Sequence, residues 1–462
     1  MDATRVNALA DDALGDSDLV DLRRRLERGE VSREELRAAS VSRLEATREL
    51  NAAVSLLAAN PIGDGPFAGI PLPIKDNEDV AGYPTAWGSA AIGPRPAPRD
   101  SAFVRQLVTL GFDPVAKTTM PEFGLTATTQ SARFGDTRNP WDLSRAVGGS
   151  SGGAAALVAA GVVPAAHAND GGGSIRIPAA ACGLVGLKPS RGRLIDRPEL
   201  ARAPIPLFTQ GFLTRSVRDS ATIYAEVERL WRNPRLPAIG HVVAPGRQRL
   251  RIAVASHGLS GIPLHAEAHA AIDRAAAICS ELGHHVEQVP PPFGPGVARD
   301  FLRYWSLLAL TLKRFGGRML SPDFDGSKTS GFTNGLAAMG RRAMPGIPPA
   351  LRRLRALAVS ADPVPTGYDL VLGPVLGHAP PALDWFSPDV PFRTHLLRLL
   401  RFVTSTPLDN ITGAPAISLP LTRTVDGLPI GVQFAARVGR EATLLELAYE
   451  LEQAAPWPTL PG

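Results

Sequence analysis

A stretch between Gly135 and Gly192 that is dense in glycine, serine and alanine constrains this chain more than any other feature. It contains the segments GGSSGG at 148–153 and DGGGSIRIP at 170–178. Glycine adopts backbone conformations barred to other residues, so successive N–H groups in such turns can converge on one point and bind an anion. An oxyanion hole requires a nest of this kind. The stretch therefore predicts the chemical centre of the protein, with a helix at 153–160 between two loops.

The rest of the composition is that of an ordinary globular enzyme. The 462 residues are 44% hydrophobic and 20% charged, which leaves ample apolar material for a buried sheet. Alternating helix and strand patterns favour a layered α/β fold. We expect one domain over 1–462, with its core at about 60–230 and 365–455. The stretch at about 290–365, rich in proline, glycine and arginine, is expected to be peripheral and variable.

Local patterns predict individual elements around the centre. Ser32 followed by Glu35 has the form of a capping box and marks one of two amphipathic helices within residues 15–59. Short apolar runs punctuated by proline and glycine at 67–86 predict a buried strand that delivers Lys75 to an interior loop. Further patterns predict a helix and then a strand at 100–116, helices at 215–230 and 265–283, and buried strands at 250–255 and 370–374.

Charge and cysteine content argue against several classes of function. The chain has 49 basic and 44 acidic side chains, a net charge of +5, and its arginines are spread out, which does not favour a nucleic-acid partner. Cys182 and Cys279 are too few for a disulfide scaffold, so a reducing cytoplasm is expected. The apolar stretch at 154–168 is too short to span a membrane, and the N-terminus does not resemble a secretory signal. A homodimer is compatible with a soluble enzyme.

A serine nucleophile needs a base, and His167 is the one histidine near the glycine-rich loops. A lysine can serve instead if it is neutral, because burial disfavours the ammonium and lowers its pKa. Lys75 is one of few lysines in this arginine-rich chain and has apolar neighbours on its N-terminal side. The residues alone leave a second interpretation open and favour it, in which Lys75 pairs with Asp76 or Glu78.

As a set, the motifs resemble the amidase signature family. The two serine segments are joined by upstream PLPIKDN and KTTMPEFG and by downstream NITGAPAISLP and DGLPIGVQ, in family order and over nearly the whole chain. The resemblance implies an α/β fold with a central mixed β-sheet flanked by helices on both faces. The amino-acid sequence at 166–178 and at 213–219 is most similar to that of the family branch that contains 6-aminohexanoate cyclic-dimer hydrolase.

The resemblance implies a Ser-Ser-Lys triad. Ser174 matches the family nucleophile, Ser150 the bridging serine that follows a cis peptide bond, and Lys75 the base. The implied reaction is hydrolysis of a carbon–nitrogen amide bond in a small molecule through an acyl-enzyme, with no metal and no organic cofactor. The acyl and amine groups of the substrate cannot be read from these motifs.

The resemblance also assigns supporting roles. Asn169 stands where many family members have Thr or Ser, and its amide can likewise accept a hydrogen bond from Lys75, so we expect altered tuning of the base. The oxyanion hole would be formed by the backbone N–H groups of Gly171, Gly172, Gly173 and Ser174. The loop would be braced by the charged pair of Asp170 and Arg176. The substrate pocket would include Phe123, Gly124 and residues from 290–365.

Other interpretations fit parts of the sequence. GGSSG also satisfies the nucleophile elbow of α/β-hydrolases, with Ser150 as nucleophile, but RNPWDLSRAV before it is not the apolar strand that an elbow needs. His265 and His269 stand four residues apart without a HExxH order or a third ligand, so a zinc site is not favoured. The amidase-like subunit of a tRNA-dependent amidotransferase and a catalytically silent binding protein remain as alternatives from other functional classes.

Overall fold

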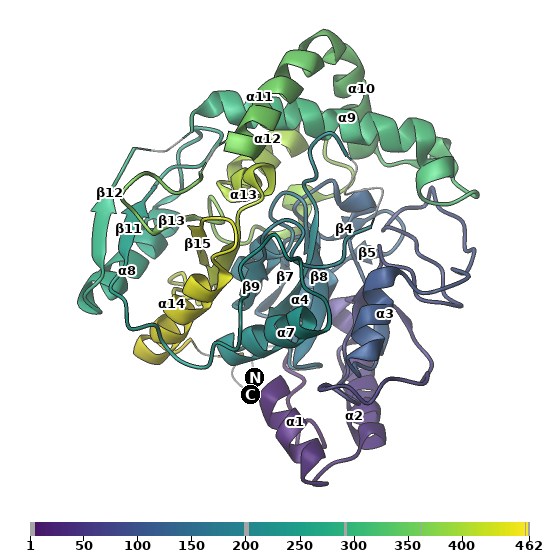
Figure 1. The fold of residues 1–462 in the computed structure, drawn as a ribbon. Helices are drawn as coiled ribbons and strands as arrows, with labels where there is room; N and C mark the ends of the chain where they lie inside the picture. The colour runs from purple at the N-terminus through teal and green to yellow at the C-terminus, as the bar shows by residue number, and fades with distance from the viewer. Residues whose placement is uncertain (1–4, 198–202, 291–292, 361, 458, 461–462) are drawn as a thin grey trace.

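An eight-stranded mixed sheet lies at the centre of the computed structural model, which describes residues 5–197, 203–290, 293–360, 362–457 and 459–460 (Figure 1). Its strands, in spatial order, are β12 (His285–Gln288), β11 (Arg251–Val254), β13 (Leu370–Pro374), β15 (Val432–Ala436), β14 (Ala416–Leu419), β9 (Val185–Lys188), β10 (Thr209–Thr214) and β8 (Ala165–Asp170). The β12–β11 and β11–β13 pairs are parallel, and the other neighbours are antiparallel. No helix in the described ranges has both the length and the apolar character needed to cross a bilayer.

Helices cover both faces of this sheet, because successive side chains of a strand point to opposite faces. On β10, Phe212 packs into the apolar cluster shared with α7 (Val217–Leu230), α8 (Ala266–Glu281) and α14 (Glu441–Ala454). The next residue, Leu213, packs into the cluster shared with α4 (Gly152–Ala159) and α5 (Arg176–Cys182). The expected class, an α/β fold with a mixed sheet between helices, is confirmed.

The N-terminal elements position Lys75. Helices α1 (Leu19–Glu27) and α2 (Arg33–Ala46) are the two expected amphipathic helices, and Ser32 and Glu35 form the expected capping box. A three-stranded sheet follows in the order β1 (Ala53–Leu56), β3 (Ala116–Thr118) and β2 (Ile74–Lys75), with α3 (Ala102–Thr109) before β3. The buried strand at Lys75 is thus present, although it is only two residues long. Two hairpins, β4 (Gln130–Ser131) with β5 (Gly135–Asp136) and β6 (Arg138–Asn139) with β7 (Asp142–Ala146), lead to the serine pair.

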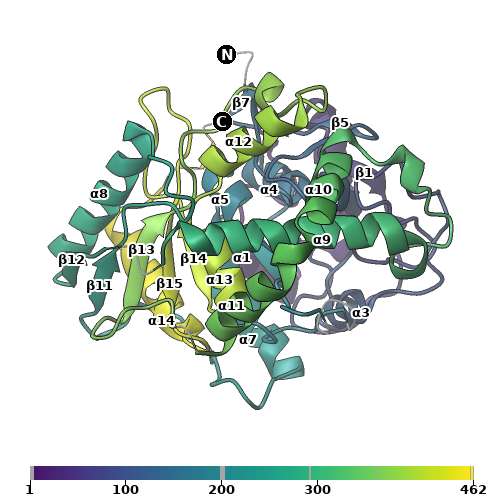
Figure 2. The same cartoon turned by 90° about the horizontal axis from the view of Figure 1, so that it is seen from above.

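The stretch at 290–365 is mostly helical. It forms α9 (Pro295–Met319), α10 (Gly331–Arg342) and α11 (Ile347–Ser360), and Figure 2 shows α9 lying across the molecule beside the other two. The sequence patterns do not predict these helices because the stretch is rich in proline. The prolines of α9 and α11 lie in the first helical turn, where a missing N–H costs no intrahelical hydrogen bond. The following α12 (Phe392–Phe402) and α13 (Thr406–Thr412) return the chain to the sheet. Helix α9 lines the pocket described below, where the sequence analysis placed residues of this stretch.

We predict that Phe212→Ala lowers the free energy of unfolding by about 3–5 kcal/mol, because it opens a cavity beneath the sheet. The ring is fully buried, with its centroid 6.1 Å from that of Phe103 and 5.6 Å from that of Tyr224. Urea denaturation followed by tryptophan fluorescence measures the change. The control Val425→Ala removes methyl groups from a side chain that is 98% exposed, so its effect should stay within about 0.5 kcal/mol. Equal effects of the two substitutions would contradict this view of the core.

Candidate active site

The ammonium nitrogen of Lys75 has three oxygen neighbours at the same distance. Lys75 Nζ lies 2.8 Å from Ser150 Oγ, 2.8 Å from Ser151 Oγ and 2.8 Å from Asn169 Oδ1. Asn169 is the next-to-last residue of strand β8, and the two serines precede helix α4, so separate elements converge on the end of β2. The expected contact between Lys75 and Asn169 is present. Ser151 was not singled out by the sequence, although it belongs to the same GGSSGG segment.

Lys75 has no carboxylate partner among these contacts, and the structure shows why. Asp76 pairs with Lys117 at 3.0 Å, and Glu78 pairs with Arg197 at 3.2 Å. The alternative in which Lys75 pairs with either acid is therefore wrong. Complete burial lowers the pKa of Lys75 to about 7, although the charge of Asp170 acts to raise it.

The serine pair follows a turn made by glycines. The peptide bond between Gly149 and Ser150 is cis, as the resemblance implied. A Cβ atom on Gly124 would lie 3.2 Å from Ser150 Oγ, so a larger residue at this position would crowd the serine hydroxyl. The strand before the turn, β7, belongs to a two-stranded hairpin and not to the central sheet. A nucleophile elbow needs a sheet strand at this point, so that interpretation of Ser150 does not fit.

Asp170 shapes the loop that carries Ser174. Its Oδ1 accepts a hydrogen bond from the amide of Gly173 at 2.7 Å, and its Oδ2 accepts one from the amide of Ile175 at 3.2 Å. Gly173 has φ +125°, and a Cβ there would lie 2.3 Å from Thr406 Oγ1, so only glycine fits. The amide of Gly173, expected in the oxyanion hole, thus points at Asp170 instead. Ser174, at the end of this loop, is 8% exposed and lines the largely apolar pocket described below.

Arg176 ties this loop to distant parts of the chain. All three guanidinium nitrogens donate hydrogen bonds in a fully buried position, and the acceptors are Asp170, Thr406, Asp409, Asn410 and Gln433. Burial acts to raise the pKa of Asp170, but the charge and hydrogen bonds of Arg176 outweigh it and hold that pKa at about 2. The expected charged pair is present. Its partners beyond Asp170 lie in or beside the segments NITGAPAISLP and DGLPIGVQ. In the sequence, these segments support only the family resemblance and predict no role for their residues.

His167 is a structural residue. Its Nδ1 accepts a hydrogen bond from the backbone N–H of Lys75 at 3.1 Å, so the ring proton is on Nε2, which faces Gln210 Oε1 at 2.9 Å. Burial lowers the pKa of His167 to about 4, which keeps the ring neutral. His265 of the HAEAH segment pairs with Glu267. Within the described ranges, no three His, Cys, Asp or Glu side chains are grouped as metal ligands.

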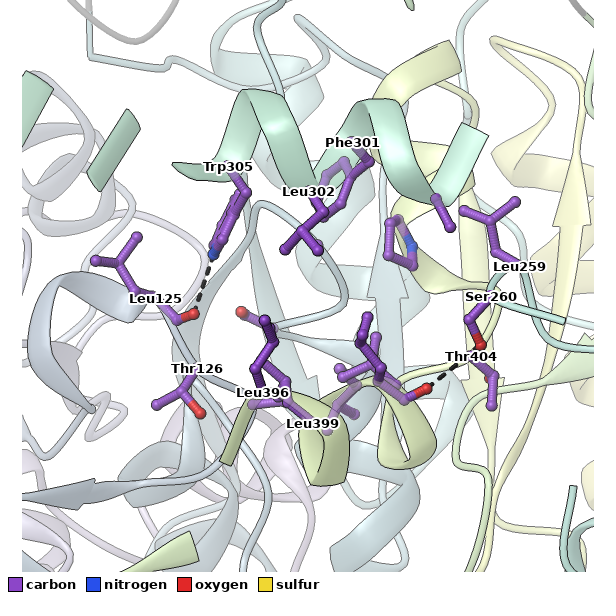
Figure 3. Close-up of a pocket in the computed structure, with 18 of the residues that line it drawn as sticks. Leu125, Thr126, Leu259, Ser260, Phe301, Leu302, Trp305, Leu396, Leu399 and Thr404 are labelled. Atoms are coloured by element: carbon purple, nitrogen blue, oxygen red, sulfur yellow. Dashed lines mark hydrogen bonds between the residues drawn. The ribbon is translucent and has the colours of Figure 1, made fainter. Parts of the chain in front are cut away.

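A pocket of about 700 Å³, including its mouth, opens beside Ser174 and Gly172 (Figure 3). One wall is the loop from Gly124 to Ala127. The other walls come from α9, with Ala298, Phe301, Leu302 and Trp305, and from α12, with Leu396, Leu399 and Leu400. Of the two expected pocket residues, Gly124 lines the cavity. Phe123 does not, because its ring is buried against that of Phe324, at 6.1 Å between centroids.

We predict that Arg176→Met lowers the free energy of unfolding by about 3–5 kcal/mol, because the carboxylates of Asp170 and Asp409 lose their buried partner. Urea denaturation measures the loss. The control Arg24→Met removes an exposed ion pair with Asp21, which contributes at most about 1 kcal/mol. A stability of Arg176→Met close to that of the control would show that the buried pair does not hold the loop.

Comparisons with known proteins agree with this architecture. A family model for amidases matches residues 22–445. A Mycobacterium leprae protein that carries the name amidase AmiC is 46% identical over 98% of both chains, and the 6-aminohexanoate-cyclic-dimer hydrolase of Paenarthrobacter ureafaciens is 34% identical over 93% of both. A solved structure of 6-aminohexanoate cyclic dimer hydrolase superposes with a TM-score of 0.84 at 30% identity, covering 97% of this chain and 98% of that one. The chain therefore belongs to the amidase signature family and is a hydrolase that acts on carbon–nitrogen amide bonds.

Proposed function

We propose that this chain hydrolyses a small-molecule amide through an acyl-enzyme on Ser174, with Ser150 as proton bridge and Lys75 as base. The contacts of Lys75 Nζ carry the proposal. Asn169 Oδ1 can only accept a hydrogen bond, and Ser151 Oγ directs its own proton to the carbonyl oxygen of Asn169 at 3.3 Å. A neutral Lys75 donates its two protons to these oxygens, so its lone pair faces Ser150, the one neighbour with a proton to give.

The first half-reaction follows from this arrangement. Lys75 takes the proton of Ser150 while Ser150 takes that of Ser174, whose Oγ attacks the amide carbonyl carbon and forms a tetrahedral oxyanion. We propose that the N–H groups of Gly171, Gly172 and Ser174 stabilise this oxyanion, since the amide of Gly173 is already engaged by Asp170. The carbon–nitrogen bond then breaks, and the proton returns through Ser150 to the leaving nitrogen.

The second half-reaction reverses these roles. A water molecule enters after the amine has left, gives its proton to Lys75 through Ser150 and attacks the acyl carbon of the ester on Ser174. Collapse of the second tetrahedral intermediate breaks the carbon–oxygen bond, returns the proton to Ser174 and releases the carboxylic acid. One triad serves both steps, since the proton that it takes up in each step is given back in the same step.

We expect Ser174→Ala and Lys75→Ala each to lower kcat/KM by at least about 1000-fold, because each removes an essential part of the relay. Release of ammonia or amine from a panel of aliphatic, aromatic, cyclic and peptide amides measures the loss. The control Ser280→Ala removes an exposed hydroxyl on α8 and should keep full activity. Turnover that survives Ser174→Ala in a folded protein would overturn the assignment of the nucleophile.

We expect kcat/KM to rise with pH through a midpoint near 7, because only neutral Lys75 can accept a proton and burial lowers its pKa to about 7. Asn169→Asp would place a carboxylate next to Lys75 Nζ, favour the ammonium and move the midpoint to higher pH. Asn169→Thr, which keeps a neutral acceptor, should move the midpoint much less than Asn169→Asp does. Initial rates between pH 5 and pH 10 measure all three proteins. A midpoint that does not move in Asn169→Asp would show that Lys75 is not the titrating base.

A further inference from the structure

The pocket beside Ser174 has an uncharged lining. Of the described residues that line it, none is a lysine, arginine, histidine, aspartate or glutamate. Most lining side chains are aliphatic or aromatic, and Figure 3 shows Leu302 of α9 above Leu396 and Leu399 of α12. A pocket of this composition binds apolar groups by removing their surface from water.

Apart from Ser174, the polar side chains of the pocket have protein partners. Trp305 Nε1 donates to the carbonyl oxygen of Leu125 at 3.0 Å, Thr404 Oγ1 to that of Pro374 at 2.8 Å, and Ser260 Oγ to that of Leu400 at 3.4 Å. Thr126 Oγ1 faces His395 Nε2 at 3.3 Å, and burial lowers the pKa of His395 to about 4, so this ring is neutral. Hydrogen-bonding capacity for a substrate is therefore concentrated at Ser174 and its loop.

No charged side chain among the described residues of the two wall helices lines the pocket. On α9, Asp300 pairs with Arg353 and Arg303. On α12, Arg398 lies over the ring of Trp385 at 4.6 Å, and Arg401 lines a separate groove. A charged substituent in the pocket would lose its water shell and find no counter-ion, which is costly.

A stack of aromatic rings brings this apolar wall up to the proposed nucleophile. The ring centroids of Phe301 and Trp305 are 5.4 Å apart, and those of Trp305 and Phe208 are 6.1 Å apart. A Cβ atom on Gly172 would lie 3.4 Å from the ring of Phe301, so the wall begins directly at the glycine loop. A substituent bonded to the scissile amide therefore enters apolar surroundings within a few atoms of the carbonyl.

We infer that the substrates are uncharged amides that carry an apolar alkyl or aryl group in this pocket, and that amides with an ammonium or carboxylate at the same place are excluded. The inference rests on the proposed function, because it takes Ser174 as the point where the scissile bond is held. It names the substrate class by chemistry: neutral aliphatic or aromatic amides.

The test compares substrates that differ only at the far end. On the acyl side, hexanamide is compared with 6-aminohexanamide and adipamic acid. On the amine side, N-hexylacetamide is compared with N-(6-aminohexyl)acetamide. We expect kcat/KM of the neutral amide to exceed that of its charged counterpart by at least about 100-fold on the side that occupies the pocket. Charged and neutral amides within about threefold of each other on both sides would overturn the inference.

A binding measurement separates this inference from the proposed function. Calorimetric titration of Ser174→Ala with the same amides needs no turnover, and the same preference for neutral ligands is expected. Preference in binding without turnover of any amide by the wild type would sink the proposed function and leave the inference about the pocket standing. Turnover of amides by the wild type without a preference for neutral over charged ligands would support the proposed function and overturn the inference about the pocket.

A charged side chain introduced into the pocket should change the preference for neutral over charged amides. Leu302→Glu introduces a carboxylate into the wall, so discrimination against the ammonium substrate should fall by at least about 10-fold, while adipamic acid stays excluded. The matched control Phe315→Glu makes the same chemical change on the same helix at a position that is 43% exposed and outside the pocket. Its selectivity should equal that of the wild type. If Leu302→Glu does not fold, the substrate series on the wild type still decides the inference.

Discussion

The buried ion pair of Arg176 and Asp170 is the interaction on which the rest of the site depends. Asp170 accepts hydrogen bonds from the backbone amides on either side of Ser174, and Arg176 connects the same carboxylate to α13 and β15, more than two hundred residues away in sequence. A buried carboxylate is costly unless it is paired and fully hydrogen-bonded, and both conditions are met here. The loop that carries the proposed nucleophile is therefore held by α13 and β15 as well as by its own strand β8.

The state of Lys75 depends on a second arrangement of charge. The neighbouring acids are taken up by Lys117 and Arg197, which leaves neutral oxygens around Lys75 Nζ. Because the ammonium is buried without a direct counter-ion, its pKa falls to about 7. A lysine paired with a carboxylate would stay charged and could not accept a proton. The proposed chemistry thus relies on where other ion pairs form as much as on the triad itself.

Most of the apolar wall of the pocket is built by a part of the chain that lies outside the quoted family motifs. Helix α9 supplies Phe301, Leu302 and Trp305, and α12 supplies the opposite side. The glycine loop provides backbone N–H groups and very little side-chain surface, so the surroundings of a substrate are set by these helices. Reactivity and substrate choice thus come from different segments, and a change in α9 or α12 can alter selectivity without touching the triad.

The sequence alone determined the positions of Ser150, Ser174 and Lys75, the glycine requirement around them, the capping box of α2 and the α/β class, since each rests on local spacing or on motifs in family order. It did not predict β8, β9 and β10, because strands buried on both faces lack an alternating pattern. Only the tertiary structure decided that Asp76 and Glu78 turn away from Lys75, that Ser151 contacts it, that Gly173 donates to Asp170 and which side chains of 290–365 line the pocket. These depend on contacts between residues far apart in the chain, which local patterns do not encode.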